Sequence, residues 1–255
     1  MSTTVDRSTL REVARLCLDA AKVLLASGAE TARVEETVCR LGRACGVEVD
    51  SVATPTGITV SVGGDRPVTR LARVRVRTID LSKVAAVNAL SRSLEAGEVG
   101  LQAAGRRLKD LVAEPPLYSV RGRYLAQGLA TSGFAMLVGG GPHDLVPSFL
   151  AGLLVRANEE RLADLPPFLS VFLNALGVVA WAALAHLLFP GTEPEVLIVA
   201  GVIPLLPGLS LTNAARDLMA GELLAGVARG ADSALTASAL AAGVYVGLSA
   251  GRTWL

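Results

Sequence analysis

Charged residues are distributed very unevenly along this chain of 255 residues, and this limits the folds that the chain can adopt. Residues 1–117 hold 31 of the 47 Asp, Glu, Lys and Arg side chains, whereas residues 118–255 hold only 16. The whole chain is 51% hydrophobic and 18% charged, below the roughly 25% charge of a typical soluble domain. The first half therefore has the composition of a soluble domain, and the second half has that of a membrane domain.

Composition also excludes several functions. A net charge of +1 and an aromatic content of 4% argue against nucleic acid as a partner. The three cysteines, Cys17, Cys39 and Cys45, are odd in number and lack CxxC spacing, so we expect small core residues instead of a disulfide or a zinc site. The chain contains no GxSxG, HExxH or Walker pattern, and we therefore expect no catalytic residue, no metal and no cofactor.

Hydrophobic periodicity predicts an α+β domain over residues 1–115, in the order helix, helix, three strands, helix, helix. The expected helices are residues 7–26, 31–45, 81–94 and 99–112, and the expected strands lie within 47–62 and 68–78. Met1 to Val13 is polar, with no apolar region typical of a cleaved signal peptide, so we expect this domain to be cytoplasmic.

Two polar groups in this domain have both a functional and a structural interpretation. Arg73, Arg75 and Arg77 alternate with valines, so they form either an anion-binding or lipid-headgroup-binding row or an ordinary exposed strand face. The carboxylates of Glu30, Glu35 and Glu36 lie near a helix start, where capping and solvation are the simpler interpretation.

Five apolar stretches predict an all-α membrane domain over residues 116–255. They cover residues 123–138, 144–155, 168–189, 196–211 and 231–255, and the second reaches spanning length only if its helix continues to Arg161. A soluble helical bundle is the alternative. The positive-inside rule, applied to Arg156, Arg161 and Arg229 in the loops, places the N-terminus inside and the C-terminus outside.

Small residues in these stretches predict close helix packing. Gly243 and Gly247 form a GxxxG pair, a spacing that lets helix backbones approach each other in lipid. We therefore expect a helix bundle or an oligomer surrounded by membrane lipid.

The fourth stretch carries the features of a broken transport helix. Pro204, Pro207 and Gly208 interrupt the helical hydrogen bonds, and such a break at membrane depth is tolerated only inside protein or beside a water-filled cavity. Ser210 could cap the second half-helix, whose free N–H groups would suit a substrate carboxylate.

Beyond the break, Asn213, Arg216 and Asp217 share one helix face by their spacing. In the functional interpretation, Arg216 binds a substrate carboxylate and Asp217 carries a proton. Thr212 is added to the candidate substrate contacts and Glu222 to the candidate proton carriers. The alternative is a proline kink followed by an interfacial Arg–Asp pair that only anchors the helix.

Two polar residues lie in the third stretch. Asn174 is either a substrate contact or a hydrogen-bonding link between helices, and His186 near the outer interface is interpreted as a packing or snorkelling residue.

A series of short motifs resembles the threonine/serine exporter family over nearly the whole chain. In the first half the motifs are Leu25-Ala26-Ser27-Gly28-Ala29-Glu30-Thr31, Val34-Glu35-Glu36-Thr37, Thr54-Pro55-Thr56-Gly57-Ile58, Arg77-Thr78-Ile79-Asp80-Leu81 and Val84-Ala85-Ala86-Val87-Asn88. In the second half they are Phe134-Ala135, Gly139-Gly140-Gly141, Pro207-Gly208, Thr212-Asn213-Ala214-Ala215-Arg216-Asp217-Leu218 and Gly221-Glu222.

The resemblance implies proton-driven efflux of small hydrophilic metabolites across the inner membrane. The relatives include a bacterial succinate exporter made of two membrane proteins. We therefore expect a secondary transporter subunit for threonine, serine or a dicarboxylate, which works with a separate five-span partner or as a homo-oligomer. The charged stretch after the short second span departs from the family pattern. The competing hypotheses are a membrane-anchored enzyme and a metabolite-sensing subunit, with the activity in residues 1–115.

Overall fold

The computed structural model describes residues 6–64, 66–75, 78–115 and 117–251. The chain divides into two compact units. Unit 1 comprises Met1–Leu117 and Leu209–Gly230, and unit 2 comprises Tyr118–Gly208 and Ala231–Leu255. The sequence assigns all residues after 115 to the membrane domain, whereas the structure groups 209–230 with the N-terminal elements.

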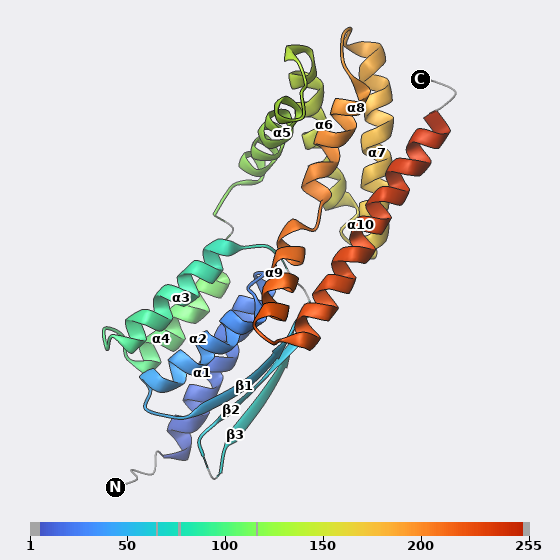
Figure 1. Cartoon of the computed structure of the whole chain (residues 1–255). Helices are drawn as coiled ribbons and strands as arrows, with labels where there is room; N and C mark the ends of the chain where they lie inside the picture. Colours follow the sequence, from blue (N-terminus) through green and yellow to red (C-terminus); the bar gives the residue numbers. More distant parts are fainter. Residues whose placement is uncertain (1–5, 65, 76–77, 116, 252–255) are drawn as a thin grey trace. The chain divides into compact units, whose positions relative to one another are not determined.

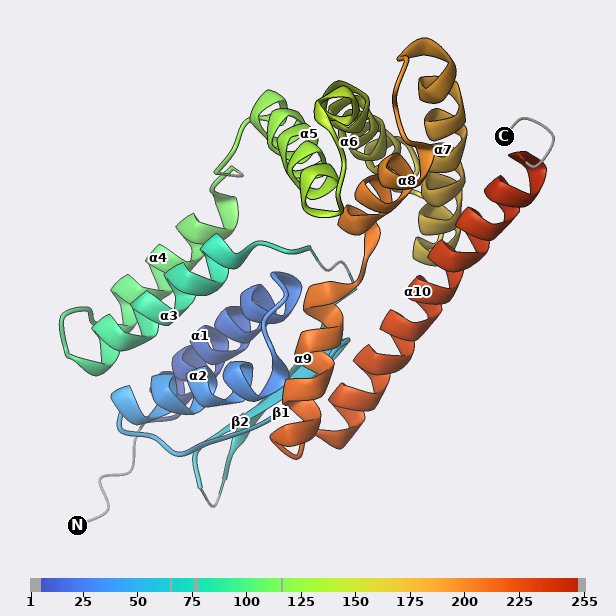
Figure 2. The same cartoon turned by 45° about the horizontal axis from the view of Figure 1, so that its top comes forward.

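Unit 1 begins with the expected order of elements. These are α1 (Arg7–Ala26), α2 (Thr31–Ala44), β1 (Val49–Thr54), β2 (Gly57–Val62), β3 (Val68–Arg73), α3 (Leu81–Glu95) and α4 (Leu101–Ala113). The sheet covers one side of α1 and α2, while α3 and α4 lie on their other side (Figures 1 and 2). The Asp80 side chain accepts a hydrogen bond from the Lys83 N–H and caps α3, as the sequence predicts.

The sheet is antiparallel in the order β1-β2-β3, with Val60 paired to both Ser51 and Arg70. Alternate residues of β2 are buried because one face of the sheet lies on α1 and α2. Residues of both helices and of the sheet share one apolar core that includes Leu24, Val38 and Ile58.

Cys17 belongs to this core, as the sequence predicts, and burial raises its pKa to about 12. The thiol therefore stays protonated at neutral pH and packs as a small apolar residue. Cys39 and Cys45 are half-buried and free.

The third strand is shorter than expected, because β3 ends at Arg73 and not at Thr78. Arg73 and Arg75 are exposed, and Arg77 lies outside the described residues. Of the described arginines in this row, only Arg73 therefore belongs to the strand, and Arg75 follows its end.

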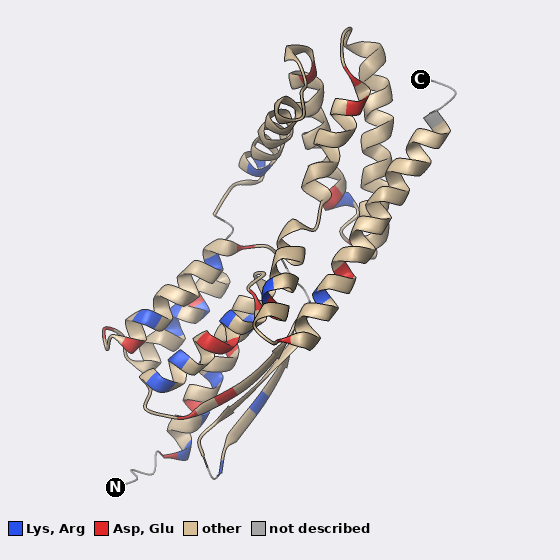
Figure 3. Ribbon diagram, in the orientation of Figure 1, with Lys and Arg blue, Asp and Glu red and all other residues tan. Residues whose placement is uncertain are grey.

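Unit 2 is helical. It contains α5 (Val120–Leu137), α6 (Leu145–Arg161), α7 (Pro167–Leu188), α8 (Pro194–Val202) and the greater part of α10 (Leu223–Gly251). Short 3-10 turns occupy Pro142–Asp144 and Ile203–Leu205. Charged side chains are frequent on α1–α4 and sparse on α5–α8, and α7 carries no Lys, Arg, Asp or Glu (Figure 3).

Two helices of the described chain, α7 and α10, are long and apolar enough to cross a membrane. A third candidate appears if α8 and its 3-10 turn are joined to α9 (Gly208–Met219) as one broken span. Helix α6 continues to Arg161, as its length requires, but neither it nor α5 passes the same criterion. The expected count of five spans therefore stays a prediction.

The glycine pair of the last helix packs closely against α7. A Cβ atom on Gly243 would lie 2.5 Å from the Phe172 carbonyl oxygen, and one on Gly247 would lie 2.8 Å from Val179 Cβ. Neither position has room for a side chain. The close packing predicted from the GxxxG spacing is confirmed within unit 2.

Candidate functional site

The broken fourth stretch places a polar helix against the turn between α1 and α2. Helix α8 ends at Val202 and α9 begins at Gly208, so the interruption falls at Pro204 and Pro207 as expected. Gly221, with φ of +87°, then reverses the chain between α9 and α10. As a result, α9 and the first residues of α10 belong to unit 1. We call their contact with the turn the Asp217 cluster, which consists of Gly28, Ala29, Thr31, Asn213, Asp217 and Arg229.

Asp217 is fully buried and has three partners. Its Oδ1 atom accepts the Thr31 backbone N–H at 2.9 Å, and its Oδ2 atom accepts the Thr31 hydroxyl at 3.0 Å. Arg229 Nε lies 3.0 Å from the same Oδ2. Thr31 is the first residue of α2, where backbone N–H groups have no partner inside the helix and the helix dipole favours negative charge. The carboxylate therefore caps α2 from a distant part of the chain.

Two side chains, Asn213 and Arg229, donate to the carbonyl groups of the turn. Asn213 Nδ2 donates to the Gly28 carbonyl at 2.9 Å, and Arg229 Nη2 donates to the Ala29 carbonyl at 2.8 Å. Gly28 itself has φ of +89°, a conformation that residues with a Cβ rarely adopt. The exposed fraction of Arg229 is only 6%, and the Asp217 carboxylate and the Ala29 carbonyl both help to compensate its buried charge.

The third residue of the predicted face lies at the edge of the cluster. Arg216 is 62% exposed, and its Nη1 atom lies 3.5 Å from Glu30 Oε2. Such an exposed pair contributes about 0–1 kcal/mol. Asn213, Arg216 and Asp217 thus all point toward the same turn, which confirms that they share a face.

A second carboxylate lies close to the cluster. Glu35 Oε1 accepts the Ala53 N–H at 2.6 Å. Burial raises the pKa of Glu35 above its ordinary value of 4.5, the Ala53 N–H opposes this shift, and the negative charges of Glu222 and Asp217 add to it. Glu222 is half-buried, and its backbone N–H donates to the Asp217 carbonyl at 2.8 Å.

The raised pKa of Glu35 predicts a pH-dependent effect of Glu35→Gln on stability. The folded state binds the proton of the Glu35 carboxyl group more tightly than the unfolded state does. The contribution of Glu35 to the free energy of unfolding therefore falls as pH rises above about 4.5. Glutamine keeps an acceptor for the Ala53 N–H but never ionises. We expect the variant to raise the melting temperature at pH 7 and to change it less at pH 4. Glu36→Gln, on the exposed side of α2, is the control. An equal shift at both pH values would contradict this assignment.

The remaining predicted residues have varied positions. Ser210 was expected to cap the second half-helix, but α9 begins two residues earlier, so Ser210 lies half-buried in its first turn. Thr212 is exposed on α9. Asn174 lies in unit 2 with 1% exposure, and its Oδ1 has no hydrogen-bond partner among the described residues. His186 Nδ1 lies 2.9 Å from the Thr192 carbonyl oxygen.

Sequence reasoning missed the roles of Thr31 and Arg229. Thr31 was interpreted only as a helix start, and Arg229 only as a loop charge that sets membrane orientation. Arg229 lies inside α10, and an ionisable residue in a largely apolar helix is a signal that could have identified it.

Comparisons with known proteins identify the class to which this fold and site belong. The family described as "Putative threonine/serine exporter" matches residues 15–251. The match covers the Asp217 cluster and both candidate spans. The chain therefore belongs to the threonine/serine exporter (ThrE) family.

Curated relatives support this placement. The chain is 28% identical to the "Probable threonine/serine exporter" of Mycobacterium tuberculosis, covering 96% of this chain and 47% of that protein. It is 26% identical to the "Threonine/serine exporter" of Corynebacterium glutamicum, covering 95% of this chain and 52% of that protein. It is 28% identical to the "Probable succinate transporter subunit YjjP" of Klebsiella aerogenes, covering 96% of each. The chain thus spans about half the length of the two exporters. No solved structure matches it.

Proposed function

We propose that this chain is a subunit of a secondary transporter that exports threonine, serine or a dicarboxylate such as succinate across the inner membrane. The observation that carries the proposal is the family match over residues 15–251, together with relatives named as exporters and as a transporter subunit. In this proposal the chain is not an enzyme. Residues 1–115 are cytoplasmic, and α5, α6, α7, the broken α8–α9 pair and α10 are the five spans.

Unpaired polar atoms inside unit 2 support a route for hydrophilic solutes. The Asn174 carbonyl oxygen and the Ser148 hydroxyl are both buried without a hydrogen-bond partner among the described residues. A buried polar group without a partner costs stability, so its presence calls for an explanation. A solute that carries ammonium or hydroxyl groups would supply the missing partner, and we assign Asn174 to substrate contact on this ground.

The proton role is assigned to Asp217, with Glu222 beside it. Protonation of Asp217 would remove its charge attraction to Arg229 and weaken the cap on α2. A proton on this carboxylate would therefore favour separation of α9 from the α1–α2 turn, and deprotonation would favour their contact. Proton binding would in this way change the position of the half-helix that follows the break.

The proposal includes a second five-span module, for which a partner subunit or a second copy of this chain is the candidate. Two observations support this. The two exporters are about twice as long as the region that matches this chain, and YjjP is named a subunit.

Efflux from preloaded cells tests the proposal. Cells loaded with threonine, serine or succinate are compared when they express this chain alone, this chain with a five-span partner, or neither. We expect efflux above background only with the partner, and the fastest solute then identifies the substrate class. Efflux from this chain alone would mean that a homo-oligomer is sufficient. Absence of efflux in every arm, with the protein shown to be in the membrane, would contradict the proposal.

A further inference from the structure

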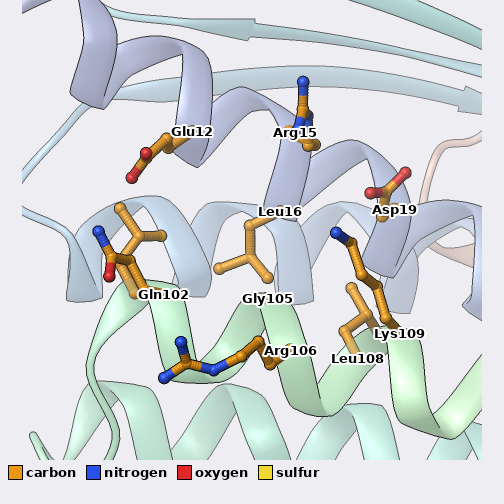
Figure 4. Close-up of a pocket in the computed structure, with 10 residues that line it drawn as sticks. Glu12, Arg15, Leu16, Asp19, Gln102, Gly105, Arg106, Leu108 and Lys109 are labelled. Atoms are coloured by element: carbon orange, nitrogen blue, oxygen red, sulfur yellow. The ribbon is translucent and has the colours of Figure 1, made fainter.

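Unit 1 contains a cavity that the Asp217 cluster does not include. It lies between α1 and α4 and has a volume of about 300 Å³, at the lower end of the range for small-molecule sites. Leu16 and Leu108 are buried residues in its wall. Figure 4 shows Leu16 and Gly105 surrounded by polar side chains from both helices. These polar residues are Glu12, Arg15, Asp19, Gln102, Arg106 and Lys109.

Charges of both signs line the cavity without pairing. Within the described residues, none of its five charged side chains forms an ion pair or a side-chain hydrogen bond. Elsewhere in the chain, opposite charges at neighbouring helix positions do pair, as Arg40 does with Glu36. The cavity therefore offers both cationic and anionic groups to a ligand.

Gly105 is the second observation that points to a ligand. It lies inside α4, where glycine is among the least favourable residues for helix stability. A Cβ atom at this position would meet no other atom within 4 Å, so packing does not require a glycine. The missing side chain does leave the wall of the cavity open. Space for a ligand explains this glycine, whereas the packing of unit 1 does not.

We propose that the cavity between α1 and α4 binds a free α-amino acid in its zwitterionic form. The carboxylate of the ligand pairs with Arg106 and Lys109, its ammonium group pairs with Glu12 or Asp19, and a short side chain covers Leu16. A dianion would face both acidic residues, and a dication would face the three basic ones. A zwitterion of this size satisfies both signs. The inference does not depend on the proposed transport function.

Binding to the purified full chain in detergent tests this assignment. The probes are L-threonine, succinate and putrescine, which are a zwitterion, a dianion and a dication of similar size. We expect saturable millimolar binding of threonine and weaker binding of the other two. Preferential binding of succinate or putrescine, or no threonine binding at these concentrations, would overturn the proposal.

Variants locate the bound ligand. Arg106→Glu is expected to weaken threonine binding at least about fivefold, because an attractive charge becomes a repulsive one. Gly105→Leu is expected to abolish binding by filling the cavity. The matched control for the first is Arg107→Glu, an exposed neighbour outside the cavity. Gly105→Ala is expected to fold and to have a higher melting temperature, because the position has room for a Cβ atom. Threonine binding that is unchanged in Arg106→Glu and Gly105→Leu would place the ligand elsewhere and refute the site.

Discussion

Replacement of Asp217 by alanine is expected to lower the free energy of unfolding by about 3–5 kcal/mol and to abolish efflux. The substitution removes the cap of α2 and the carboxylate that lies 3.0 Å from Arg229 Nε, which is buried at 6% exposure. Denaturant unfolding of the purified protein and efflux from preloaded cells measure the two effects. Asp110→Ala, at an exposed position of α4, is the control and should change stability by less than about 0.5 kcal/mol.

Two related variants separate the structural role of Asp217 from its proposed proton role. Asp217→Asn keeps one acceptor for Thr31 but loses the charge that faces Arg229, so we expect it to be less destabilised than Asp217→Ala and to remain folded. It cannot exchange a proton, so we expect no efflux from it. The double variant Asp217→Ala with Arg229→Leu removes both buried charges and should recover much of the lost stability. Wild-type efflux in Asp217→Asn, or restored efflux in the double variant, would show that the pair is structural only.

The second large effect is expected at the contact between α7 and α10. Gly243→Ala places a Cβ atom 2.5 Å from the Phe172 carbonyl oxygen, a backbone atom that cannot rotate away. We expect a loss of about 1–3 kcal/mol, and a larger loss for Gly243→Val, because the two helices must move apart. Gly133→Ala is the matched control, since a Cβ there meets nothing within 4 Å. Thermal unfolding in detergent provides the measurement, and equal stability of the two alanine variants would contradict the predicted packing.

The sequence predicts much of the local structure because local rules determine it. Hydrophobic periodicity predicts the order of elements in residues 1–115, and Pro204 and Pro207 predict the break before α9. The spacing of Asn213, Arg216 and Asp217 predicts that they share a face. None of these patterns indicates what that face contacts. Its partner is the turn before Thr31, 186 residues away from Asp217 in the sequence, and periodicity carries no information about pairing over such a distance.

Buried ion pairs are equally difficult to predict from one sequence. Arg229 lies near the start of α10, where an arginine is also expected at a membrane surface. Only the structure shows that its guanidinium group lies against Ala29 and Asp217. The cavity between α1 and α4 was missed for a related reason. Its charged residues follow ordinary surface spacing on each helix, and no pattern within one helix indicates that α1 and α4 leave a hollow beside Gly105.

The distant cap of α2 has a consequence for biosynthesis. The N-cap residue of this helix, Glu30, forms no capping hydrogen bond with its own side chain, and Asp217 supplies the acceptor instead. The first turn of α2 therefore receives the hydrogen bonds from Thr31 to Asp217 only after the ribosome has translated the chain as far as Asp217. Contacts of such long sequence separation form late in folding. Residues 1–115 expressed alone would lack this acceptor, and they would lack Asn213 and Arg229, which donate to the Gly28 and Ala29 carbonyls. A soluble fragment of unit 1 therefore needs residues 209–230 supplied as well.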